Sequence, residues 1–315
     1  MSRLVVISNR VAVPEARGAA GAQGGLAGAL NAALREKGGV WFGWSGQECA
    51  RFTGTIDRQV SEDGVVTATI DLEPQDIEEY YNGYANSTLW PLFHYRIDLT
   101  EYEREYGKGY ERVNDLFAES VRPLIEPGDV VWVHDYHFMP LGERLRQRGV
   151  RNRLGFFLHI PWPPANLFVS LPYHERLVRS LLRYDLLGFQ NNVWLESFLH
   201  YCETQLGAEV DRETGEITYE GRSVIARAYP IGIDYEQFME KGSCGEARQA
   251  QQRLESSTRH RTAMIGVDRL DYSKGLPERL DGIARFFERY PDRVRELVFV
   301  QIAPPSREDI GSYQN

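Results

Sequence analysis

The stretch Leu4-Val5-Val6-Ile7-Ser8 decides the fold class of this 315-residue chain. Because it is apolar without alternation before the serine, it predicts a strand that is buried on both faces. Similar runs recur at residues 130–133, 154–158, 186–189, 224–229, 263–267 and 297–302. Segments with helical periodicity separate them, at residues 26–37, 111–125, 141–148, 171–182, 193–206, 245–255 and 277–290. This alternation predicts a doubly wound α/β fold, with a mostly parallel sheet and helices on both of its faces.

The sequence predicts two domains, residues 1–234 and residues 235–315. The run 224–229 ends at a Pro/Gly turn, and a new series of helices and strands begins after Asp234. Two predicted strands follow that boundary, and a span of about 80 residues is shorter than the roughly 150 that a doubly wound domain needs. We therefore expect the second domain to be incomplete in this sequence. Within the first domain, turn residues between positions 52 and 69 predict an inserted hairpin.

Composition narrows the class of protein. Hydrophobic residues make up 42% of the chain and charged residues 26%, which is typical of an ordered globular protein. The formal net charge of −9 argues against a nucleic acid or an anionic membrane as the partner. No apolar run approaches the length of a membrane span, and the 3 cysteines predict neither disulfides nor a zinc site. A cytoplasmic location is therefore expected, whereas the sequence does not determine whether the chain forms a homo-oligomer.

Polar residues follow the predicted strands. They are Asn9, Arg10, His134, Asp135, His159, Gln190, Asp268, Arg269, Ser306 and Arg307. Ligands of open parallel sheets bind beyond the carboxyl ends of the strands, so these residues are candidates for a binding site. Each also has a plainer interpretation, such as a surface charge for Arg10 or a core histidine for His159. A metal group at residues 134–137 is disfavoured, because neighbours on an extended segment point in opposite directions.

Residues 268–275, Asp-Arg-Leu-Asp-Tyr-Ser-Lys-Gly, form the most informative segment. Arg269 follows a predicted strand, and Lys274 precedes a helix that begins near Pro277. We expect two cations and backbone N–H groups to converge there, an arrangement that stabilises a departing diphosphate without a metal. A solvated charged loop is the alternative. No Asp-x-Asp pair occurs in the sequence, so the usual carboxylate platform for a metal-bound nucleotide sugar is not predicted.

The stretch Gly24-Gly25-Leu26 lies at the start of the first predicted helix. Glycines at a helix N-terminus let backbone N–H groups approach a pyrophosphate. The Gly-x-Gly-x-x-Gly spacing is absent, so a dinucleotide site is not predicted, and a simple loop explains the glycines equally well.

Taken as a whole, the sequence resembles the trehalose-6-phosphate synthase family, glycosyltransferase family 20, over essentially its full length. The segments that carry the resemblance occur in the family's order and are Val5-Val6-Ile7-Ser8-Asn9-Arg10, Gly24-Gly25-Leu26, Trp41-Phe42-Gly43-Trp44-Ser45-Gly46, Glu79-Tyr80-Tyr81-Asn82, Leu89-Trp90-Pro91, Trp132-Val133-His134-Asp135-Tyr136-His137, Phe157-Leu158-His159-Ile160-Pro161 and Val267-Asp268-Arg269-Leu270-Asp271-Tyr272-Ser273-Lys274-Gly275-Leu276. The resemblance implies a GT-B fold, in which two Rossmann-like domains hold the active site in a cleft between them.

The resemblance also implies a reaction. Glucose would move from UDP-glucose to glucose 6-phosphate with retention, giving α,α-trehalose 6-phosphate and UDP, without a cofactor or a metal. It implies attack from the front face through an oxocarbenium-like state, with the leaving phosphate taking the proton. No protein nucleophile is then needed, and electrostatic stabilisation of the diphosphate carries the catalysis.

The matching positions imply two groups of site residues. On the acceptor side are Arg10, Tyr81, Trp90, Asp135 and Arg307, with the two arginines on the sugar phosphate and Asp135 on its hydroxyls. On the donor side are Gly24, Gly25, His159, Arg269 and Lys274, with His159 facing the transferred glucose. Of these residues, His159, Asp135, Arg269 and Lys274 are expected to act in catalysis.

The chain departs from the family's pattern in two places. Pro164-Ala165-Asn166 stands where an acidic residue is common, and the family's later donor-binding loop does not occur in this sequence. Two other functions therefore stay open: a glucosylglycerol-phosphate synthase, and a non-catalytic homologue that binds a sugar phosphate. The segment 272–276, together with Trp90 and Arg307, favours glucose 6-phosphate as the acceptor. The base of the donor nucleotide is not determined.

Overall fold

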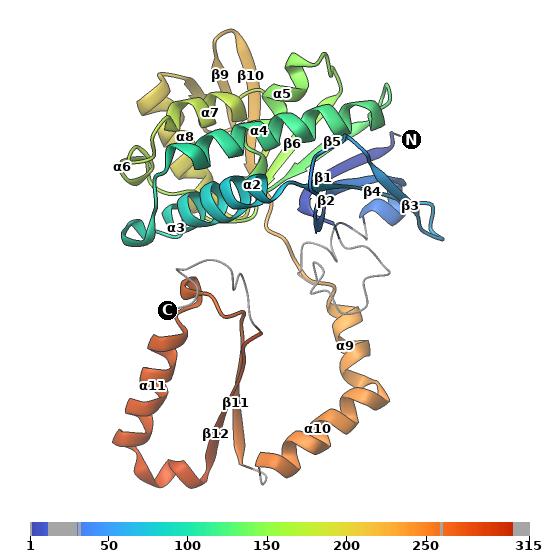
Figure 1. Ribbon diagram of the computed structural model, residues 1–315. Helices are drawn as coiled ribbons and strands as arrows, with labels where there is room; N and C mark the ends of the chain where they lie inside the picture. The colour runs from blue at the N-terminus through green and yellow to red at the C-terminus, as the bar shows by residue number, and fades with distance from the viewer. Residues whose placement is uncertain (1, 12–29, 31–32, 259–260, 305–315) are drawn as a thin grey trace. The chain divides into compact units, whose positions relative to one another are not determined.

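The computed structural model describes residues 2–11, 30, 33–258 and 261–304 (Figure 1). The chain divides into two compact units, Met1–Ile231 and Gly232–Asn315. The division lies at the Pro/Gly turn that follows the last strand of the first unit, three residues before the boundary expected at 234.

Unit 1 is built on one large sheet. Its strands in the order of the sheet are β3 (Asp57–Val60), β4 (Val66–Leu72), β2 (Gly39–Glu48), β1 (Leu4–Arg10), β5 (Val130–His134), β6 (Arg153–Leu158), β7 (Leu186–Phe189), β10 (Arg222–Ala228), β9 (Glu216–Tyr219) and β8 (Glu209–Asp211). Every pairing from β4 through to β10 is parallel. The mostly parallel sheet that the apolar runs predicted is confirmed.

Helical segments cover both faces of this sheet. On β2, successive side chains point to opposite faces. Phe42 packs edge-on against Phe117, with 5.5 Å between the ring centroids, whereas Trp41 belongs to a buried cluster with Leu30 and Leu34. Phe117 lies on α4 (Arg104–Val121), and Leu30 and Leu34 lie in the helical segment that precedes β2. Burial on both faces explains why Val5, Val6 and Ile7 of β1 could be continuously apolar.

The edges of the sheet correct one expectation. The hairpin predicted within residues 52–69 exists as the antiparallel pair β3 and β4, but it is not a separate insertion. β4 also pairs in parallel with β2, so it extends the main sheet. β2 itself was not predicted, because its sequence GVWFGWSGQE carries three glycines in place of a β-branched run.

Helical elements of unit 1 connect the strands. Besides the helical segment before β2, they include α2 (Pro74–Asp76), the π-helix η1 (Ile77–Leu89), α3 (Trp90–Phe93), η2 (Ile97–Leu99), α4, η3 (Arg122–Leu124), η4 (Tyr136–Phe138), α5 (Leu141–Gln147), α6 (Ala165–Phe168), α7 (His174–Leu181) and α8 (Asn192–Leu206). The π-helix is rare in proteins and tends to occur at functional sites. None of the described helices is long and apolar enough to cross a membrane.

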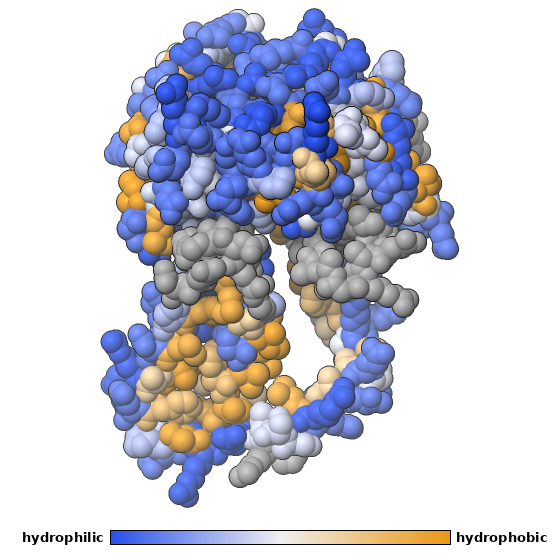
Figure 2. All heavy atoms as spheres, viewed as in Figure 1, coloured by the Kyte–Doolittle hydropathy of each residue, from blue (hydrophilic) through white to orange (hydrophobic). Residues whose placement is uncertain are grey.

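Unit 2 contains α9 (Tyr235–Ser243), α10 (Gly245–Thr258), β11 (Thr262–Val267), η5 (Tyr272–Lys274), α11 (Leu276–Arg289), η6 (Pro291–Arg295) and β12 (Leu297–Ile302). β11 and β12 pair in parallel, and α11 lies between them in sequence, which makes one strand–helix–strand crossover. Ile265, Val267, Leu280 and Ile302 are each more than half exposed. Figure 2 shows apolar atoms gathered over this part of unit 2.

Candidate active site

Four neighbouring strands of unit 1 end in the polar residues that the sequence singled out. β1, β5, β6 and β7 are adjacent and parallel, so their carboxyl ends meet at one edge of the sheet. Arg10 ends β1, while Asp135, His159 and Gln190 directly follow β5, β6 and β7. In open α/β sheets this edge is where ligands bind.

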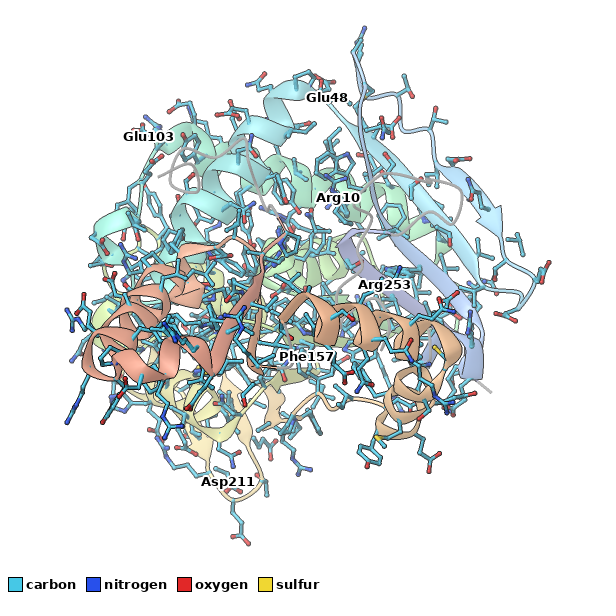
Figure 3. All side chains as sticks on the ribbon, turned by 90° about the horizontal axis from the view of Figure 1, so that it is seen from below. Arg10, Glu48, Glu103, Phe157, Asp211 and Arg253 are labelled. Carbon is cyan, nitrogen blue, oxygen red and sulfur yellow. The ribbon has the colours of Figure 1, made fainter. Side chains whose placement is uncertain are left out.

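Arg10 is labelled in Figure 3. Its guanidinium lies over the indole of Trp44, with its carbon 4.3 Å from the ring centroid. Arg10 and Trp44 are register partners in β1 and β2. Gly46 makes room for the arginine, because a Cβ there would lie 1.7 Å from Nη1. The positive φ of Gly46, 91°, also favours glycine. The arginine is thus exposed but held in one place.

Aromatic rings connect Arg10 to the π-helix. Trp44 contacts Tyr81 edge-on at 5.5 Å between centroids, and Tyr81 stacks on His137 at 6.1 Å with 14° between the ring planes. Tyr81 lies in the first half of η1, and Trp90 follows its last residue. The Trp90 side chain is buried and packs on Tyr136, with 5.7 Å between centroids.

Asp135 holds the ends of β5 and β6 together. Its Oδ1 accepts the backbone N–H of Tyr136 at 3.1 Å and that of His159 at 3.2 Å. Its backbone has φ of 76° and ψ of 168°, a region that is otherwise almost restricted to glycine. A carboxylate fixed by two N–H donors stays an acceptor, which suits a contact with sugar hydroxyls.

Three side chains form a hydrogen-bonded row beyond β5, β6 and β7. His134 Nδ1 and His159 Nε2 are 3.0 Å apart, and Gln190 Nε2 is 3.4 Å from His159 Nδ1. Gln190 Oε1 accepts the N–H of Ile231 at 3.0 Å. Burial lowers the pKa of His159, against the opposing charge of Asp135, and burial with the neighbouring His159 lowers the pKa of His134 well below its usual value. Both imidazoles are therefore neutral near pH 7.

In unit 2 the candidate residues follow β11. Arg279 donates to Asp268, and this hydrogen bond lowers the pKa of the Asp268 carboxyl. The pair offset each other's charge, which leaves Arg269 and Lys274 as the exposed cations of the segment. The Arg269 guanidinium lies 3.9 Å from a carboxylate oxygen of Asp271.

The turn before α11 is fixed by local contacts. Asp271 caps η5 by accepting the N–H of Ser273 at 2.9 Å. Gly275 adopts a left-handed conformation with φ of 61°, and α11 begins with Pro277 in its first turn. Lys274 therefore precedes the N-terminus of a helix of 14 residues, where the helix dipole also favours an anion.

Four candidate residues, Gly24, Gly25, Ser306 and Arg307, lie outside the described residues. The sequence assigned no role to Trp44, Gly46 and Gln190 individually, although Gln190 stood at a strand end and the two others stood in a matching segment. Among the residues that the structure describes, no group of three or more His, Cys, Asp and Glu is positioned to hold a metal ion.

The chain is similar to known proteins over its full length. The model of glycosyltransferase family 20 matches residues 2–315. A trehalose-6-phosphate synthase of Sinorhizobium fredii is 44% identical over 315 residues, 100% of this chain and 68% of that protein. A solved α,α-trehalose-phosphate synthase (UDP-forming) of Burkholderia xenovorans in complex with glucose-6-phosphate has a TM-score of 0.90 at 41% identity, covering 99% of this chain and 68% of the other. A structure from E. coli bound with UDP-2-fluoro glucose has a TM-score of 0.90 at 40% identity, covering 99% and 67%.

The similarity to these solved enzymes assigns the fold to the GT-B class of glycosyltransferases. The family match narrows the class. The chain belongs to glycosyltransferase family 20, and it spans between 65% and 68% of the length of the curated relatives it matches.

Proposed function

We propose that the protein transfers glucose from UDP-glucose to glucose 6-phosphate with retention, giving α,α-trehalose 6-phosphate and UDP, a step of trehalose biosynthesis. The observation that carries the proposal is the placement of Arg10 over Trp44 at the edge of the sheet where Asp135 and His159 also lie. A held guanidinium and a fixed carboxylate at the same edge of the sheet match an acceptor that has both a phosphate and hydroxyls. The relatives crystallised with glucose 6-phosphate and a UDP-glucose analogue support the same pair of substrates.

In this proposal unit 1 binds the acceptor. Arg10, with Arg307, pairs with the phosphate, and Asp135 accepts hydrogen bonds from the sugar hydroxyls. Tyr81 and Trp90 form the aromatic side of the site. His159 meets the transferred glucose, and because its imidazole is neutral it adds no charge beside an oxocarbenium-like state.

The donor diphosphate pairs with Arg269 and Lys274 of unit 2, and Gly24 and Gly25 contribute backbone N–H groups. The acceptor hydroxyl attacks the anomeric carbon on the face that the diphosphate leaves. The bond from that carbon to the diphosphate oxygen breaks, the new glycosidic bond forms, and the acceptor proton passes to the departing phosphate oxygen. The two cations stabilise the charge that grows on that oxygen.

The cysteines and the net charge support a proposed location and a class of ligand. Cys49, Cys202 and Cys244 are free, which supports a cytoplasmic enzyme. The net charge of −9 supports small anions held by local cations rather than a nucleic acid.

The test is an assay of the purified full-length protein with UDP-glucose and either glucose 6-phosphate or glycerol 3-phosphate. We expect UDP release and trehalose 6-phosphate formation with glucose 6-phosphate. Turnover with glycerol 3-phosphate alone would instead indicate a glucosylglycerol-phosphate synthase. Binding of glucose 6-phosphate without any transfer would indicate a non-catalytic homologue.

A further inference from the structure

Asn86 lies in η1, the π-helix that also bears Tyr81, and its buried amide reaches the turn that begins at Asp135. Asn86 has no exposed surface. Its Nδ2 donates to the backbone carbonyl of Tyr81 at 2.8 Å, and its Oδ1 accepts the hydroxyl of Tyr136 at 2.9 Å. One side chain thus bonds both to the π-helix that bears Tyr81 and to the turn that begins at Asp135.

Both ends of this connection are otherwise anchored. The Tyr136 carbonyl accepts the Tyr110 hydroxyl at 2.6 Å, and the Tyr136 N–H donates to Asp135. Within η1, the N–H of Trp90 bonds to the carbonyl of Ala85, next to Asn86. A shift of the Asn86 amide would therefore move Tyr81, Trp90 and Asp135 together.

Asparagine is a poor choice for the interior of a helix on propensity alone, because its side chain competes for backbone hydrogen bonds. Here that competition is used, since the amide reaches the carbonyl five residues earlier, the spacing of a π-helix. Ser87 makes the same type of bond, from its Oγ to the carbonyl of Asn82 at 2.9 Å, but Asn82 is not among the residues proposed to bind glucose 6-phosphate. Asn86 and Ser87 therefore differ in the residue whose carbonyl they bond.

We propose that Asn86 is a positioning residue for the acceptor: its amide fixes the Tyr81 segment against the turn that begins at Asp135. The inference rests on the proposed function, because it assumes that these segments bind glucose 6-phosphate. It goes beyond that function by assigning a part in acceptor affinity to a side chain that has no exposed surface.

The experiment compares Asn86→Ala, Tyr136→Phe and Ser87→Ala in the full-length protein. We expect Asn86→Ala to weaken glucose 6-phosphate binding about tenfold, by calorimetry and as a raised KM, while the KM for UDP-glucose stays unchanged. Tyr136→Phe should give a smaller loss on its own and no further loss when combined with Asn86→Ala, because both remove the same bond. Ser87→Ala should leave glucose 6-phosphate binding within about twofold, a change of at most a few tenths of a kcal/mol.

The outcomes separate the two claims. If Asn86→Ala changed both substrates equally, or no more than Ser87→Ala does, Asn86 would be merely structural and the inference would be wrong, with the proposed function intact. If the unsubstituted protein itself bound no glucose 6-phosphate, the proposed function would be wrong and this inference would be wrong with it.

Discussion

The two units hold their candidate residues in different ways. In unit 1, Arg10 is held by an indole and Asp135 by two backbone N–H groups, above a core of fully buried aliphatic and aromatic side chains. In unit 2, Arg269 and Lys274 are exposed, and within its described residues no hydrophobic side chain is fully buried. The proposed acceptor side is thus pre-organised by packing, whereas the proposed donor side offers charge.

This difference predicts different responses to substitution. In unit 2, where exposed cations would stabilise the diphosphate, removing one cation should lower the rate of the chemical step. In unit 1, where packing positions the candidate residues, altering a neighbour of those residues should weaken acceptor binding.

The largest effect is expected at Lys274. Lys274→Ala removes a cation from the growing charge of the diphosphate, so kcat should fall roughly 10² to 10³-fold. Steady-state kinetics with saturating glucose 6-phosphate measure the change. Lys241→Ala, at an exposed lysine of α9, is the matched control and should keep full turnover. Near-normal kcat in Lys274→Ala would contradict the donor assignment.

The next largest effect is expected at Gly46. Gly46→Ala places a methyl group at the position of the Arg10 guanidinium, so the KM for glucose 6-phosphate should rise roughly tenfold to a hundredfold. Gly54→Ala imposes a similar backbone strain, with φ of 76°, but nothing lies within 4 Å of its Cβ. Equal KM values in the two variants would show that Arg10 does not bind the acceptor phosphate.

Acid should destabilise unit 1 through its buried histidines. Because the pKa of His134 is lower in the folded than in the unfolded protein, the unfolded chain binds the proton first as pH falls below about 6.5. The free energy of unfolding should then fall by up to about 1.4 kcal/mol per pH unit for this histidine. His134→Gln should flatten the slope, and His200→Gln, at an exposed histidine, should not.

Urea unfolding followed by tryptophan fluorescence measures this effect selectively. All 6 tryptophans lie in unit 1, so the signal reports that unit alone. Parallel slopes for His134→Gln and the unsubstituted protein would mean that His134 is protonated equally in the folded and the unfolded states.

The smallest effect is expected at Trp44. Trp44→Leu removes the ring beneath Arg10 and should weaken glucose 6-phosphate binding about twofold to fivefold, the usual range for an exposed cation–π contact. Trp44→Phe also loses the indole N–H but keeps an aromatic face, so it should lie between Leu and Trp. Identical calorimetric affinities of the two variants for glucose 6-phosphate would show that the aromatic ring at position 44 does not contribute to acceptor binding.

The sequence was sufficient for the parallel sheet because apolar runs such as Val5-Val6-Ile7 show burial on two faces directly. It was not sufficient for β2, where Gly39, Gly43 and Gly46 interrupt the run, or for η1, whose polar residues have no periodicity that favours a helix. Gly43 and Gly46 serve contacts with the chain around Ser8 to Arg10, which are visible only in three dimensions.

Some residues of the candidate site could likewise be predicted from the sequence, whereas others could not. Residues at strand ends, such as Arg10, Asp135, His159 and Arg269, follow from the rule that ligands bind at the carboxyl ends of strands, and the structure places each of them at such an end. Their assigned roles stay predictions. Residues that act through others, such as Asn86 and Gln190, depend on hydrogen bonds between distant segments, which no spacing along the chain specifies.

The backbone at Asp135 carries a conformational cost, with φ of 76°. A non-glycine residue in that region is disfavoured by about 1–3 kcal/mol. A glycine there would relieve that strain, but it would also lose the two hydrogen bonds that the carboxylate accepts from the backbone of Tyr136 and His159. The strained backbone is thus retained together with the carboxylate that joins the ends of two strands, and neither can be exchanged without the other.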